Sequence, residues 1–85
     1  MGRQRTLEAI SKSEYVTIGE LVRLTKVRYS TLKFYTEEGL IPFEQAEEKL
    51  TRRYPRLQTI QKINEIIQLR QQGLSMDEVK SKLLG

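Results

Sequence analysis

The first clear hydrophobic pattern along the chain predicts a short amphipathic helix over residues 18–25. Thr17 and Glu20 mark its start, because a threonine followed three residues later by a glutamate forms a capping box that covers free backbone amides. Val16 precedes this cap and is placed to pack back against the helix. The positions at helical spacing that predict a buried face are Ile18, Leu21, Val22 and Leu24.

A second short helix is predicted over residues 29–38, after a connection of three residues. Val27 in that connection is the apolar residue that a tight helix-turn-helix uses to hold its two helices at a fixed angle. Leu32 and Tyr35 point inward, and Gly39 suits the left-handed position that ends a helix. The positions expected to face outward are Arg28, Tyr29 and Lys33, with Thr36 as a further candidate.

Residues 43–54 keep neither a helical nor a strand period, and we interpret them as a wing, a loop flanked by two short extended segments. Pro42, just before this segment, prevents the preceding helix from continuing. A small helix within residues 44–50 is the alternative interpretation.

Two more helices are predicted after the wing. One of roughly four turns begins near Pro55, which suits a first helical turn, and ends at Gly73. Ser75 and Glu78 form a second capping box before the last short helix. The expected fold is therefore mainly α, a winged helix-turn-helix with about four helices and a small wing. The core is expected to contain Leu21, Leu24, Leu32, Leu40, Leu57, Ile60, Ile63 and Ile67.

The chain has 85 residues, which fits one small domain. We interpret residues 15–84 as that domain and residues 1–14 as an N-terminal arm that is a candidate for disorder. Arg3 and Arg5 in this arm either add salt-sensitive affinity for a polyanion or contribute nothing.

Charge and composition narrow the functional class. The formal net charge of +4 and the sequence pI of about 9.6 favour a polyanionic partner. The absence of cysteine and histidine excludes zinc sites and cysteine or histidine nucleophiles, so no metal or cofactor is expected. The glutamates form no convincing acid and base pair, and no glycine-rich phosphate loop is present, so an enzyme is not expected. No apolar run is long enough to cross a membrane, which favours a soluble, cytoplasmic, nucleoid-associated protein.

Five short motifs follow one another in the chain. They are Ile18-Gly19-Glu20-Leu21, Thr31-Leu32-Lys33-Phe34-Tyr35, the group Gly39, Leu40 and Pro42, Arg52-Arg53-Tyr54, and Gly73 followed by the capped helix from Ser75 to Leu83. Their order resembles the DNA-binding domain of the MerR (mercury-resistance regulator) family over about residues 15–84. The resemblance implies a winged helix-turn-helix that binds double-stranded DNA, with residues 29–38 as its recognition helix.

The chain also departs from the family's pattern. Lys33 and Phe34 replace the usual arginine and tyrosine, so one bidentate guanidinium and one phenolic hydroxyl are missing. Lys26 stands where the family often has a glycine, and Arg28 stands where a serine cap is common. Nothing after Leu84 resembles the family's long dimerisation helix or effector-sensing part. Neither the usual antiparallel dimer nor a small-molecule effector is therefore expected.

The recognition helix is expected to supply most of the DNA contacts. Arg28 and Lys33 are placed to reach base edges and phosphates in the major groove. Ser30 and Thr31 either cap this helix or bind phosphate at its start. Tyr35 is expected to be half-packed, with its hydroxyl left to reach a phosphate.

The wing is expected to contact the flanking DNA backbone or the minor groove through Arg52 and Arg53, with Lys49 as a further candidate. The complete set of candidate DNA-binding residues is Thr17, Arg28, Tyr29, Ser30, Thr31, Lys33, Tyr35, Lys49, Arg52, Arg53 and Tyr54.

These features predict a bacterial, sequence-specific double-stranded DNA-binding protein that regulates transcription. One helix and one wing reach only a short site, so adjacent copies of the chain or a bound partner are expected to supply the rest of the affinity. Three alternatives stay open: an architectural or excisionase-like DNA-binding protein, a small protein-interaction module whose basic face docks an acidic partner, and the N-terminal reader of a longer polypeptide.

Overall fold

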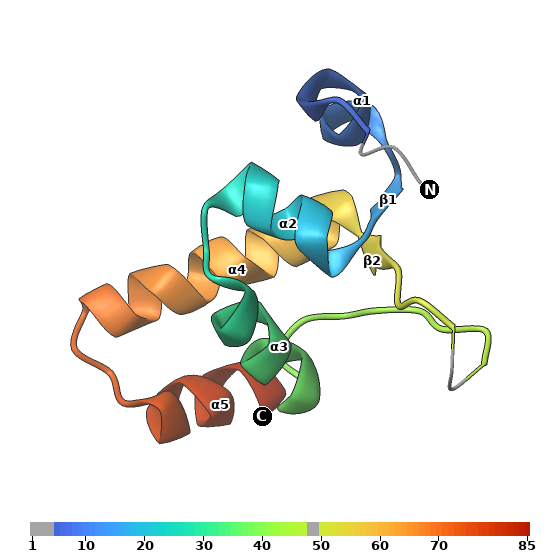
Figure 1. Ribbon diagram of the computed structural model, residues 1–85. Helices are drawn as coiled ribbons and strands as arrows, with labels where there is room; N and C mark the ends of the chain where they lie inside the picture. Colours follow the sequence, from blue (N-terminus) through green and yellow to red (C-terminus); the bar gives the residue numbers. More distant parts are fainter. Residues whose placement is uncertain (1–4, 48–49) are drawn as a thin grey trace.

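The computed structural model describes residues 5–47 and 50–85. In these residues the chain forms five helices and two short strands around one hydrophobic core (Figure 1). All four predicted helices are present, and a short N-terminal helix is additional. The elements are α1 (Leu7–Lys12), β1 (Tyr15–Val16), α2 (Ile18–Thr25), α3 (Tyr29–Glu37), β2 (Tyr54–Pro55), α4 (Arg56–Gln71) and α5 (Met76–Leu84).

The helix-turn-helix is formed by α2 and α3. The capping box at the start of α2 is confirmed: Thr17 Oγ1 accepts a hydrogen bond from the Glu20 amide at 3.2 Å, and the Thr17 amide donates to Glu20 Oε1 at 2.9 Å. Lys26 ends α2 in the left-handed conformation, with φ of 63°. Its amide donates to the Val22 carbonyl at 2.8 Å, which closes the helix. The turn between the helices therefore requires a conformation that lysine adopts only with strain.

The wing extends away from the helices after α3 (Figure 1). Glu44 and Arg53 pair across its base as an isolated antiparallel bridge, with N···O distances of 2.7 and 2.8 Å. The alternative of a small helix within residues 44–50 is wrong for the described part of that segment. The next two residues form β2, which pairs with β1 in the register Tyr15 to Pro55 and Val16 to Tyr54. The end of the wing is thus tied to the strand that precedes α2.

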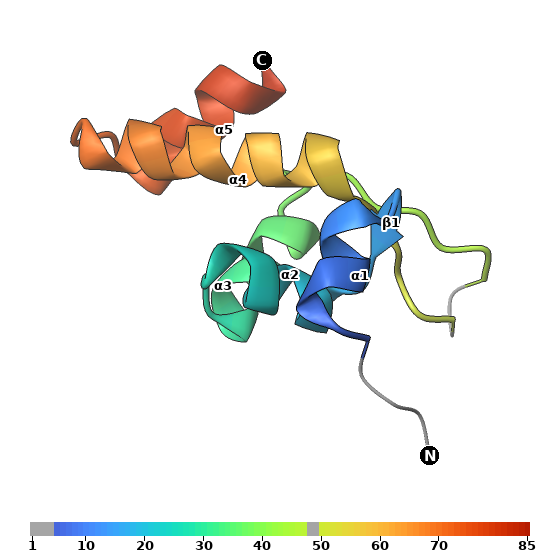
Figure 2. The ribbon, with the colours of Figure 1, turned by 90° about the horizontal axis from the view of Figure 1, so that it is seen from above.

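The long helix α4 packs against other helices of the domain. It contacts α2 and α5, and Figure 2 shows it between α5 and the pair formed by α2 and α3. Thr59, Ile63 and Ile66 are its buried positions. The buried apolar residues of the domain are Ile10, Val16, Leu21, Leu32, Tyr35, Leu40, Ile41, Tyr54, Ile63, Ile66 and Val79.

The expectation that Leu57 belongs to the core is wrong, because this side chain is 70% exposed. On a helix with 3.6 residues per turn, Leu57 points about 160° away from Thr59, which is buried. The expected core positions Leu24, Ile60 and Ile67 pack against the core while partly buried. At the N-terminal end of α4, the buried face therefore includes Thr59 and excludes Leu57.

Residues 5–14 of the N-terminal arm contain the short helix α1, and the arm's candidacy for disorder stays a prediction. Thr6 caps α1 by accepting a hydrogen bond from the Ala9 amide at 3.1 Å, and Ile10 is fully buried. Arg5 donates to the two carboxylate oxygens of Glu20 at 2.7 and 2.8 Å, which fastens the arm to α2. Arg3 lies outside the described residues.

The Arg5–Glu20 contact makes stability depend on pH. The hydrogen bond from Arg5 lowers the pKa of the Glu20 carboxyl below its ordinary value. Because this pKa is lower in the folded than in the unfolded chain, the carboxylate stabilises the fold above the unfolded pKa of roughly 4.3, and this contribution is lost as pH falls through the folded pKa. We expect Glu20→Gln to reduce the free energy of unfolding at pH 7, and the gap to the wild type to shrink at pH 3.

Urea denaturation at the two pH values measures this gap. Glu8→Gln is the control, because it neutralises an exposed carboxylate on α1 whose ionic partner is the nearby Lys12. A gap between wild type and Glu20→Gln that is the same at pH 7 and pH 3 would contradict the role given to the ion pair.

Lys26 provides a second test of the fold. We expect Lys26→Gly to raise the free energy of unfolding by roughly 0.5–1 kcal/mol, because glycine adopts the left-handed conformation without the strain of a Cβ atom. Lys26→Ala removes the same charge but keeps the Cβ, so it should give no such gain. Equal stabilities of the two variants in urea denaturation would rule out backbone strain at this position.

Candidate nucleic-acid interface

The outward side of α3 is polar and basic. Arg28, Tyr29 and Lys33 are exposed, as predicted, and Ser30 is exposed as well, whereas Thr31 is half-buried. Arg28 is the N-cap residue, and no side chain among the described residues caps α3. The alternative that Ser30 or Thr31 caps this helix is therefore wrong. The backbone amides of the first turn remain available to an anion at the positive end of the helix dipole.

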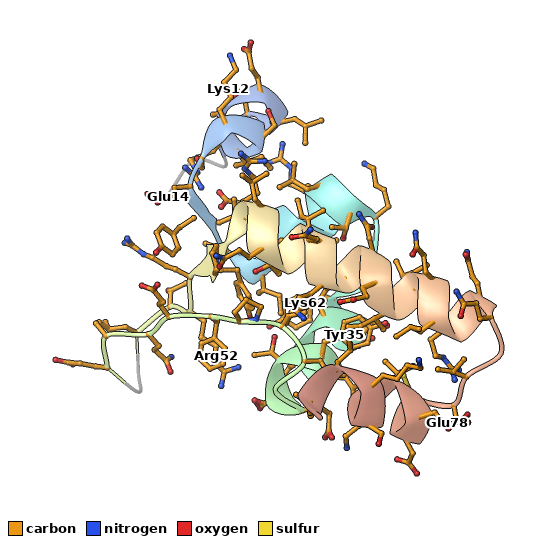
Figure 3. The ribbon with its side chains drawn as sticks, turned by 180° about the vertical axis from the view of Figure 1, so that it is seen from behind. Lys12, Glu14, Tyr35, Arg52, Lys62 and Glu78 are labelled. Carbon is orange, nitrogen blue, oxygen red and sulfur yellow. The ribbon has the colours of Figure 1, made fainter. Side chains whose placement is uncertain are left out.

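The two arginines of the wing have different surroundings. The Arg52 guanidinium lies 4.8 Å from the centre of the Phe43 ring and 3.4 Å from the carboxylate of Glu37 on α3. Figure 3 shows Arg52 on the wing beside α3. Arg53 is exposed and forms the backbone bridge with Glu44. Arg52 is thus held in place by its neighbours, whereas Arg53 projects from the base of the wing.

A groove separates the recognition helix from the wing. Tyr29 and Lys33 line its helical side, Thr51 and Arg52 line the wing side, and Tyr54 lies at the junction. Two cations and one carboxylate, that of Glu37, therefore face this groove. This places Lys33 of the helix and Arg52 of the wing on one continuous surface.

Tyr54 connects the wing to α3 inside the core. Its predicted role as a DNA contact is wrong. The side chain is 1% exposed, and its hydroxyl lies 2.9 Å from Thr36 Oγ1. Successive side chains of an extended segment point to opposite faces, so Tyr54 points inward where Arg53 points outward. Thr36, a candidate for the outward face, is likewise buried, and its hydroxyl donates to the Leu32 carbonyl at 2.9 Å.

Tyr35 is also a core residue rather than half-packed. It is 7% exposed, and burial raises the pKa of its hydroxyl, an effect that the nearby charge of Arg70 on α4 partly offsets. Figure 3 shows Tyr35 on the side of α3 that faces α4 and α5. The contact between this hydroxyl and a phosphate stays a prediction, because the hydroxyl oxygen is not among the fully buried unpaired atoms of the described residues.

Two candidate DNA-binding residues remain, Thr17 and Lys49. Thr17 is half-buried at the start of α2, where its hydroxyl is engaged in the capping box. Lys49 lies outside the described residues.

Sequence reasoning gave no role to Phe34, although this side chain is 44% exposed on α3. Projecting all positions of the helix at 3.6 residues per turn would have placed Phe34 on the outward face.

The geometry defines the class of protein: α3 follows α2 as the second helix of a helix-turn-helix, and a wing lies beside it, which makes the domain a winged helix-turn-helix. The model of the family described as MerR HTH family regulatory protein matches residues 16–85. The chain belongs to this family, which consists of DNA-binding transcription regulators and not of enzymes. No curated protein and no solved structure gives a significant match.

Two further findings concern residues 5–47 and 50–85. Within them, no helix combines the length and the apolar character needed to span a membrane. The same residues contain no group of three or more acidic side chains placed to hold a metal ion.

The buried Tyr54 hydroxyl provides a test of how the wing is attached. We expect Tyr54→Phe to lower the free energy of unfolding by roughly 0.5–1.5 kcal/mol, the usual net contribution of a buried hydrogen bond. Thr36 keeps its bond to the Leu32 carbonyl in this variant, so no buried hydroxyl is left unpaired. Tyr15→Phe, which removes an exposed hydrogen bond to Glu44, should cost less because water replaces the lost partner. Equal losses in urea denaturation would contradict this assignment.

Proposed function

We propose that this chain recognises specific sequences in double-stranded DNA and thereby regulates transcription. In this proposal α3 enters the major groove, and the wing contacts the flanking backbone or the minor groove. The observation that carries it is the continuous basic surface formed by the outward side of α3 and the wing, with Lys33 and Arg52 facing one groove. A duplex presents a major groove wide enough for a helix, with phosphates on either side of it.

The residues would have distinct roles in such a complex. Lys33 is long enough to reach acceptors on the edge of a guanine. Tyr29 and Ser30, with the uncapped amides of the first turn, would bind a phosphate and fix the register of the helix. Arg53 would bind the backbone beside the wing, and Arg52, held over the Phe43 ring, would face the groove beside α3. The half-buried Thr17 is proposed as a phosphate contact at the start of α2.

A single copy offers one helix and one wing, which is a small contact area for a specific complex. We propose that adjacent copies on the duplex, or a partner bound beside the chain, supply the additional affinity. Selection of bound sequences from a random duplex library, followed by measurement of stoichiometry on the selected site, tests this directly. One copy bound at nanomolar affinity would contradict the need for a second.

The division of roles predicts different effects of two substitutions. We expect Lys33→Ala to change which base is preferred at one position of the selected site, at a cost of about 1–3 kcal/mol on that site. Arg53→Ala should weaken all sequences alike and reduce the slope of log affinity against log salt by about one. Lys62→Ala, on α4 behind the helix-turn-helix, is the control for charge alone (Figure 3).

Fluorescence anisotropy of labelled duplexes at several salt concentrations measures both effects. Salt-independent binding, or equal losses for all three variants, would contradict DNA recognition through this surface. Binding to an acidic protein with no measurable binding to any duplex would instead favour the interaction module.

A further inference from the structure

Phe34 is an apolar ring exposed on a recognition helix whose other outward positions are polar. Its side chain is 44% exposed, while Leu32, Tyr35 and Thr36 of the same helix are buried. At 3.6 residues per turn, Phe34 points about 150° away from the centre of these three side chains. The ring therefore points to the side of α3 that is turned away from the core.

The Phe34 ring lies beside one buried aromatic side chain. Its centre lies 6.3 Å from that of Tyr35, with the two ring planes tilted by 57°. The buried Tyr35 thus limits the positions that the Phe34 ring can take without covering its outer surface. The cost of leaving this surface in water is recovered only when something apolar covers it.

The chemistry of the major groove suggests which apolar group covers the Phe34 ring. Phenylalanine has no hydroxyl, so it cannot bond to a phosphate or to the polar edge of a base. The thymine C5 methyl is the apolar group that a base pair presents in the major groove, and phenylalanine is among the side chains that contact it. Ser30 and Glu37, which flank Phe34 on the outward side, are exposed and polar. An apolar ring with polar flanking residues fits one methyl group better than a broad apolar protein surface.

We propose that Phe34 is a specificity-determining residue that reads a thymine through its C5 methyl group. This inference rests on the proposed function, because it requires α3 to lie in the major groove. Phe34 supplies a preference for thymine over cytosine at one position, and it does so through contact area rather than through a hydrogen bond.

Uracil tests the proposal, because it pairs like thymine but lacks the methyl group. In the sequence selected from the random library, each thymine is replaced singly by uracil, and the affinity of each duplex is measured for the wild type and for Phe34→Ala. We expect one replacement to weaken wild-type binding about fourfold, the effect of one buried methyl group. The same replacement should leave the affinity of Phe34→Ala unchanged.

Phe34→Leu is the matched variant, because it keeps an apolar side chain and should retain part of the uracil effect. Urea denaturation of both variants checks that the fold is kept, as expected for an exposed position. A uracil effect of equal size in wild type and Phe34→Ala, or a selected site that requires no thymine, overturns the inference while the proposed function stands. A wild-type protein that binds no duplex overturns both.

Discussion

The buried contact between the Tyr54 hydroxyl and Thr36 is the constraint on which the placement of wing and recognition helix depends. Tyr54 ends the wing and Thr36 lies on the inward side of α3, so one hydrogen bond at 2.9 Å joins two segments that are separate in the sequence. The ion pair of Arg52 and Glu37 is a second contact between the wing and α3. It lies at the surface, where an ion pair contributes little stability. The internal contact therefore sets the distance between the two parts, and the external one orients a side chain.

Glu20 has a comparable role on the other side of the helix-turn-helix. Its Oε1 atom accepts hydrogen bonds from the Thr17 amide and from Arg5, so one carboxylate both starts α2 and fastens the N-terminal arm. The carbonyl of Arg5 in turn accepts a hydrogen bond from Arg23 at 2.6 Å, near the end of α2. The arm thus contacts both ends of α2, in addition to the packing of α2 against α4.

The sequence was most informative where structure is determined by neighbours along the chain. The capping residues Thr17 and Ser75 located two helix starts correctly, because each bonds to a residue three positions away. Predictions for Leu57 and Tyr54 were wrong because burial there depends on which distant element packs on each face. Hydropathy alone treats a leucine at the edge of a stripe like one at its centre, and a family motif does not reveal that Tyr54 points inward. The pairing of β1 with β2 gave no local signal at all.

The uncapped start of α3 has a thermodynamic consequence. Arg28 offers no oxygen to the amides of the first turn, so this turn is less stable in the free chain than it would be with serine or aspartate at that position. An anion bound there supplies the missing acceptor and stabilises the turn as it binds. Binding and local folding of the turn are then coupled equilibria, and a ligand that binds the folded turn raises the stability of the whole domain by mass action.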